Sequence, residues 1–150
     1  MELIKNRRGK MTKIKKDGED LIINIKCRIP FGVEFYNRNK IINLSLLNQN
    51  NEEYNSIQEF KSLEKQIIEV IPDEYKNTRS FISSIRSLDE KIGQKIIRTY
   101  ISKKKGEEYI LTSEFLKTKH LVEATIKFDS VWTSQTSYGV MVNILNVKRV

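Results

Sequence analysis

The sequence is poor in the residues that most often carry catalysis or hold metal ions. It contains one cysteine, Cys27, and one histidine, His120, so an internal disulfide and a zinc finger are both excluded. His120 follows Lys119 at the start of a predicted strand and lacks the nearby nucleophile or carboxylate that a general base needs. We therefore expect no catalytic residues, no metal site and no cofactor, and predict that the protein is not an enzyme.

Long hydrophobic runs and nucleotide-binding signatures are missing as well. No apolar run approaches the roughly 18 residues that span a bilayer, and no apolar stretch of a secretory signal follows the charged N-terminus. The sequence has neither a glycine-rich phosphate loop nor a Gly-x-Ser-x-Gly motif. These absences favour a protein of a reducing intracellular compartment, in the cytoplasm or nucleus of a host cell, without membrane contact.

Positive charge is the most prominent feature of the composition. The 150 residues suit one domain and carry a formal net charge of +8. Residues 1–40 contain eleven Lys or Arg and five Asp or Glu, so this segment carries six of the eight net positive charges. A basic balance of this kind favours a polyanionic partner such as nucleic acid.

The first 19 residues contain few large apolar side chains and two glycines, Gly9 and Gly18. Such a segment buries too little apolar surface to offset the entropy lost when it becomes ordered. We therefore predict a basic, flexible N-terminal arm over residues 1–19 and a single nucleic-acid-binding domain over residues 20–150. A first β-strand is the alternative for this segment, because residues 11–14 alternate in character.

Periodicity predicts several strands and one helix. Alternation with a period of two over residues 21–29 indicates a half-buried strand. Ser56 as a cap, with Glu59 three residues later, predicts a helix over residues 56–71 that ends at Pro72. Further strands are predicted over residues 40–47, 81–85, 95–102, 119–128 and 138–147. Short strands with one inserted helix predict a mainly β fold, a small closed or partly closed barrel, with another α+β sheet as the alternative.

Two groups of residues have the composition of a single-strand binding surface, in which aromatic rings stack on bases and cations neutralise phosphates. The first group lies on a predicted strand and the loop after it, and comprises Lys26, Arg28, Phe31, Phe35, Tyr36, Arg38 and Lys40. The second comprises Arg98 and Tyr100, predicted to face outward, and a basic hairpin tip of Lys103, Lys104 and Lys105. Phe31 and Phe35 could equally close one end of the barrel.

Trp132 lies in the polar connection between the last two predicted strands, within the sequence VWTSQTSYG. A tryptophan in this place either closes the core or offers a flat surface to a base. The neighbouring Val131 favours the core, since it continues the strand pattern. We keep Trp132 among the candidate nucleic-acid-binding residues.

The segment HLVEATIKFDSVWTSQTSYGVMVNILNVKRV resembles the last hairpin of OB-fold single-stranded-DNA-binding proteins of large DNA viruses and phages. In that group an aliphatic residue and a tryptophan end one strand, as Val131 and Trp132 do here. An aromatic residue and a glycine begin the next strand, as Tyr138 and Gly139 do here. FISSIRSLDEKIGQKIIRTYI is similar to the central strands of the group, so the resemblance covers about residues 81–150.

This resemblance implies an OB-like barrel that binds single-stranded DNA without sequence preference, by base stacking and phosphate neutralisation. Replication, recombination or repair is the implied context, with replication proteins as further partners. Phage members recruit such partners through an acidic C-terminal tail, whereas this sequence ends in Val147-Lys148-Arg149-Val150. The alternative is a non-enzymatic structural or transcription-complex subunit of a virus or phage whose basic surface serves another interaction.

Overall fold

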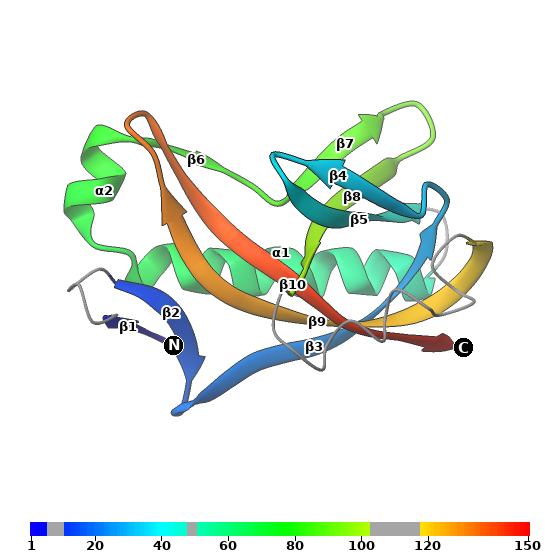
Figure 1. The fold of residues 1–150 in the computed structure, drawn as a ribbon, viewed down its shortest axis with the longest axis horizontal. Coiled ribbons are helices and arrows are strands. Elements are labelled where there is room, and N and C mark those ends of the chain that lie inside the picture. The colour runs from blue at the N-terminus through cyan, green and yellow to red at the C-terminus, as the bar shows by residue number, and fades with distance from the viewer. Residues whose placement is uncertain (6–10, 48–50, 103–117) are drawn as a thin grey trace.

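The structure, a computed structural model, describes residues 1–5, 11–47, 51–102 and 118–150 (Figure 1). In these ranges the chain forms ten strands and two helices. The strands are β1 (Glu2–Lys5), β2 (Met11–Lys16), β3 (Glu19–Ile29), β4 (Val33–Tyr36), β5 (Asn39–Leu47), β6 (Ser80–Ile82), β7 (Ile85–Asp89), β8 (Gln94–Ile101), β9 (Thr118–Thr133) and β10 (Ser137–Arg149). The helices are α1 (Asn51–Val70) and α2 (Asp73–Thr78).

Five of the strands close into a barrel. Strand β3 pairs antiparallel with β9, and β9 pairs antiparallel with β10. Strand β10 runs parallel to β8 at one place, β8 pairs antiparallel with β5, and β5 returns to β3 through the pair of Arg28 and Ser45. The circuit β3–β5–β8–β10–β9 is therefore continuous. The prediction of a mainly β barrel with one long inserted helix is confirmed.

The alternating strands point their apolar residues into the barrel, and α1 packs against it (Figure 1). Helical spacing puts Ile57, Phe60 and Ile67 on the buried face of α1. The ring of Phe60 meets the ring of Phe128 from β9 with centroids 4.9 Å apart. Cys27 is buried in this core, and desolvation raises the pKa of its thiol to about 12. Among the described residues, no helix is long and apolar enough to cross a bilayer.

The helix begins five residues earlier than the capping box predicts. Ser56 lies inside α1, where it is buried and its Oγ accepts a hydrogen bond of 2.9 Å from the backbone N–H of Lys26. Glu53 is also buried, forms an ion pair with Arg28 and accepts the backbone N–H of Leu47 at 2.6 Å. These contacts with β3 and β5 stabilise the additional turn, and local sequence cannot reveal them.

The N-terminal segment belongs to the sheet where the structure describes it, although its composition favours a flexible arm. Strand β2 pairs with β1, with β3 and, through Lys13 and Ser130, with β9. Ile14 is only 2% exposed, and Lys13 forms an ion pair of 3.1 Å with Asp129. Neighbouring strands supply backbone hydrogen bonds to the segment, and Ile14 and two ion pairs, Lys13 with Asp129 and Lys15 with Asp20, add to them.

Candidate nucleic-acid interface

The outer face of β8 carries Arg98 and Tyr100, the members of the second predicted group that the structure describes. Ile97, Thr99 and Ile101 are buried on the inner face of this strand. Arg98 and Tyr100 alternate with them and therefore point away from the barrel, as the sequence pattern predicts. The face presents one guanidinium and one aromatic ring, which are the two kinds of group that single-strand binders combine.

The β4–β5 hairpin brings Tyr36 from the first predicted group to this face. Its two-residue turn, Asn37 and Arg38, has φ values of +47° and +66°, as a primed turn requires. The guanidinium of Arg98 lies over the ring of Tyr36, with Cζ 4.0 Å from the ring centroid. This cation–π contact joins the two predicted groups, which lie about sixty positions apart in the sequence.

Trp132 reaches the same face from the end of β9. It lies opposite Gly139 of β10, and a Cβ at Gly139 would come within 2.6 Å of the indole and 2.7 Å of the Ile82 carbonyl oxygen. Only glycine leaves room for the ring at this position. The indole therefore packs on the backbone, half-buried, while its neighbour Val131 points into the core.

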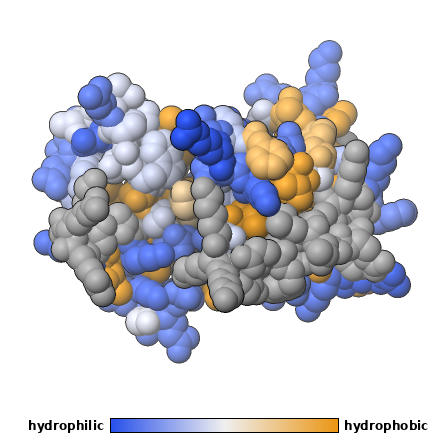
Figure 2. Space-filling model, in the orientation of Figure 1, coloured by the Kyte–Doolittle hydropathy of each residue, from blue (hydrophilic) through white to orange (hydrophobic). Residues whose placement is uncertain are grey.

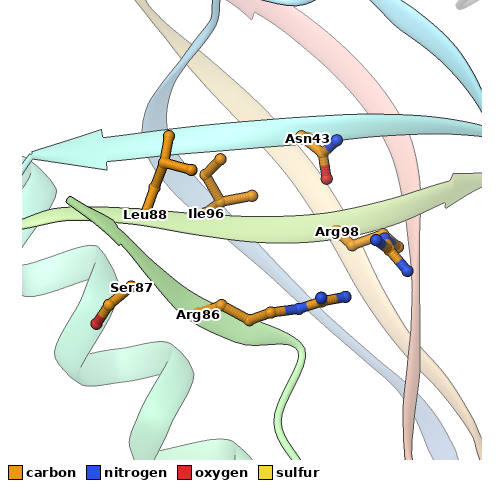
Figure 3. A pocket seen from close by; sticks show the side chains of 6 residues that line it. All are labelled: Asn43, Arg86, Ser87, Leu88, Ile96 and Arg98. Carbon is orange, nitrogen blue, oxygen red and sulfur yellow. The ribbon is translucent and has the colours of Figure 1, made fainter.

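These side chains line a continuous depression, which we call the β8 groove. One part has a volume of about 390 Å³, and Tyr36, Tyr100 and Trp132 are among its lining residues. The other part has a volume of about 300 Å³ and is lined by Asn43, Arg86, Ser87, Leu88, Ile96 and Arg98 (Figure 3). Arg86 and Arg98 line both parts, so the two hollows adjoin at these arginines.

Strand β7 is positioned beside β8 by a buried carboxylate from the helix. Ser83 and Ser84 link β6, which pairs with β10, to β7, which pairs with β8. Glu64 of α1 accepts a hydrogen bond of 2.6 Å from Ser83 Oγ and one of 3.1 Å from the Ser84 backbone N–H. Burial raises the pKa of Glu64. Ser84 Oγ donates to the carbonyl of Val140 at 2.8 Å, so the link is fixed on both sides.

Two predicted binding residues lie elsewhere and are already neutralised. Lys26 forms an ion pair of 2.9 Å with Glu123, and Arg28 pairs with the buried Glu53. Both cations belong to β3, and neither lines the groove. Alternation along β3 indicates which residues face outward, but it does not show that carboxylates from β9 and α1 lie against them.

The remaining members of the first group lie at the surface. Phe35 is 74% exposed and Phe31 is 46% exposed, so neither closes the end of the barrel. Arg38 and Lys40 are exposed in the same hairpin as Phe35. Lys103, Lys104 and Lys105 lie outside the described residues, as does the predicted hairpin tip that contains them. The face drawn in Figure 2 shows hydrophobic residues over the end of the molecule where β4, β7 and β8 lie in Figure 1.

Sequence reasoning missed Arg86, because the strand predicted over residues 81–85 ends one position before it. In the structure β7 continues to Asp89, and Arg86 pairs with Ile96 on the outer face. Alternation could have identified Arg86, because it lies two positions after Ser84 and therefore on the same face of an extended chain. Asn43 was missed for a different reason: it lies within a predicted strand, but its neighbours on β5 are mostly apolar. Its side chain donates to Glu34 Oε1 at 2.9 Å.

The closed five-stranded barrel and its groove define an OB-fold. In chain order the barrel strands are β3, β5, β8, β9 and β10, so β5 and β8 are the second and third. OB-folds bind oligonucleotides on the face of these two strands and with the loops after the first and fourth. The β4–β5 hairpin and the β9–β10 turn occupy those loop positions here.

The comparison with solved structures agrees with this class. The fold is similar to the crystal structure of gp2.5, a single-stranded DNA-binding protein encoded by bacteriophage T7, with a TM-score of 0.52. The match covers 86% of this chain and 91% of that chain at 12% sequence identity, so the similarity is one of fold. The predicted resemblance to OB-fold single-stranded-DNA-binding proteins of phages is thus confirmed in the fold. No protein-family model and no curated protein sequence matches the chain.

Proposed function

We propose that this protein binds single-stranded DNA with little sequence preference, through the β8 groove. The observation that carries the proposal is the convergence of Tyr36, Tyr100, Trp132, Arg86 and Arg98 in one groove. This groove lies on the barrel face with which OB-folds bind oligonucleotides. The similarity of the fold to a phage single-stranded DNA-binding protein supports the same function.

The groove suits binding without sequence readout. Tyr100 and Trp132 are half-buried rings in its wall, and every base offers a face on which such rings can stack. Arg86 and Arg98 supply the positive charge that phosphates need. Of the residues that the structure describes, no three His, Cys, Asp or Glu side chains gather as a metal-binding group would. Binding without turnover, in replication, recombination or repair together with replication proteins, is the proposed role.

A fluorescence titration tests the proposal. Trp132 is the only tryptophan of the chain and lines the groove, so its emission reports occupancy of the site directly. Oligo-dT should quench this emission at low salt, and the affinity should fall as salt rises because phosphate contacts release counterions. Absence of salt-sensitive binding would refute the proposed function.

A second function, docking of another protein, is favoured by exposed apolar side chains at the same end of the molecule. Phe35, Leu88 and Ile92 are all exposed there, on or beside the β4–β5 and β7–β8 hairpins. The chain would then be a structural or transcription-complex subunit. Phe35→Ser separates the two functions: it should leave oligo-dT affinity unchanged if Phe35 serves a protein contact, and weaken it if the ring stacks on a base.

A further inference from the structure

The geometry points to a single phosphate held jointly by Arg86 and Arg98. We propose that these two arginines clamp one phosphodiester, and that the two hollows of the β8 groove take the two bases of that dinucleotide step. This inference rests on the proposed function. It adds the position of the strand within the site and assigns a role to Arg86.

The strand register places the two arginines within reach of one phosphate. Arg86 of β7 lies directly opposite Ile96 of β8, and Ile96 and Arg98 are two positions apart on the same face. Arg86 and Arg98 are therefore diagonal cross-strand neighbours, a relation that corresponds to roughly 7–8 Å between backbones. Figure 3 shows their side chains extending in the same direction from β7 and β8.

The groups around Arg98 leave it short of acceptors. Of the residues that the structure describes, Nε of Arg98 is a buried donor without a hydrogen-bond partner. No carboxylate of the described residues forms an ion pair with Arg86 or Arg98, whereas Arg28 and Lys26 are both paired. The Arg98 guanidinium lines both hollows, and a phosphate is the acceptor that the fork of donors on such a group matches best.

The two hollows differ in a way that fits two bases on either side of that phosphate. One hollow offers the rings of Tyr100 and Trp132, on which a base can stack. The other is lined by Leu88 and Ile96, whose aliphatic surface can cover a second base without aromatic stacking. Because the arginines line both hollows, they lie where the phosphate between two successive bases must pass.

The salt dependence of oligo-dT binding counts the phosphates that the arginines neutralise. Each phosphate neutralised on a single strand contributes about 0.7 to the slope of log affinity against log salt. If the two arginines share one phosphate, Arg86→Ala with Arg98→Ala should reduce the slope by about 0.7 in total. A reduction of about 1.4 would show two separate phosphates, and an unchanged slope would show none, and either result overturns the inference.

Matched controls keep the outcome interpretable. Lys65→Ala removes one exposed positive charge from α1 outside the groove and should leave the slope unchanged. Arg98→Lys keeps the positive charge but replaces the guanidinium fork with an ammonium group that has fewer hydrogen-bond donors. A thermal melt of each variant shows whether the fold is retained. If wild-type protein fails to bind oligo-dT at all, the proposed function fails. If the wild type binds, but the slope of the double variant falls by about 1.4 or does not change, the proposed function stands and only the shared phosphate is refuted.

A dinucleotide probe gives a second and independent readout. Thymidylyl-thymidine with its natural phosphodiester should bind more tightly than the same dinucleotide with a neutral methylphosphonate linkage. In the double arginine variant this difference should disappear, because the charge of the linkage then has no partner. A preference for the charged linkage that survives in the double variant would overturn the clamp.

Discussion

Among the single residues of the groove, Tyr36 differs from Tyr100 and Trp132 because it contacts Arg98. One face of the Tyr36 ring is covered by the guanidinium at 4.0 Å, although the side chain is 43% exposed. The ring therefore holds Arg98 in place and has only its other face for a base. Tyr100 and Trp132 line the groove without such a cation contact among the described residues.

We expect Tyr36→Ala and Tyr100→Ala to weaken single-strand binding, each by about 1–3 kcal/mol, with little change in melting temperature. Loss of a buried aromatic ring would instead cost about 3–5 kcal/mol of folding free energy. The effect of Tyr36→Ala should shrink in an Arg98→Ala background, since Tyr36 acts partly through Arg98. Oligo-dT titrations of the two single variants and the double variant measure this coupling. Full additivity would contradict a positioning role for Tyr36.

Gly139 is the residue on which the position of Trp132 depends. We expect Gly139→Ala to displace the indole, because the added methyl would lie 2.6 Å from its ring. Overpacking of this kind costs about 1–3 kcal/mol of stability. The emission maximum of Trp132 and the urea midpoint measure the two effects together. Unchanged emission in a folded variant would contradict the close approach of indole and backbone.

At the scale of elements, the N-terminal hairpin of β1 and β2 is a structural part of the sheet. We expect deletion of residues 1–16 to lower the melting temperature, because it removes the pairing of β2 with β3 and β9 and the buried Ile14. Lys13→Gln tests the ion pair with Asp129 by itself and should cost less than the deletion, whereas a change at Asp129 would also remove its ion pair with Lys127. A flexible arm would predict an unchanged melting temperature for the deletion, so one melt separates the two descriptions.

The contact of α1 with the β6–β7 link makes stability depend on pH through Glu64. Burial raises the folded-state pKa of this carboxyl above its ordinary value of 4.5, so the folded state binds the proton more tightly than the unfolded state. The stability from this group is fully present below the unfolded pKa and is lost as pH rises through the folded pKa. The unfolding free energy of the wild type should therefore fall relative to Glu64→Gln over that interval.

Urea denaturation of the wild type and Glu64→Gln at a series of pH values measures this difference. The Gln side chain keeps the size of the carboxyl and can still accept from the Ser84 backbone N–H. A wild type that gains stability relative to the variant as pH rises would show that the two serine hydrogen bonds outweigh burial. Glu59→Gln, an exposed position on the same helix, serves as the control.

At the scale of the whole molecule, the groove should distinguish single strands from duplex. Its rings can stack only on unpaired bases, whereas the net charge of +8 attracts any nucleic acid. We expect oligo-dT to bind more tightly than duplex DNA at moderate salt, with single-stranded RNA titrated in parallel. Equal affinity for duplex and single strand would leave only general electrostatic attraction.

Sequence pattern alone predicts the barrel strands, the buried face of α1 and the outward position of Arg98 and Tyr100. These features follow from periodicity, because a strand repeats every two residues and a helix every 3.6. The excess of positive charge and the scarcity of Cys and His also follow from composition alone. The strands, the helix face and the outward residues can be predicted because their periodicity depends only on neighbours along the chain.

Which of the candidate residues lie together depends on the folded arrangement of the chain. Lys26 and Arg28 have the right composition for binding, but Glu123 and Glu53 neutralise them from β9 and α1. Arg86, which the pattern did not select, lines the groove because Glu64 fixes the link before β7. The pairing of β2 and the early start of α1 depend in the same way on partners distant in sequence. Charge compensation and close approach are properties of neighbours in space, and a periodic pattern contains no information about them.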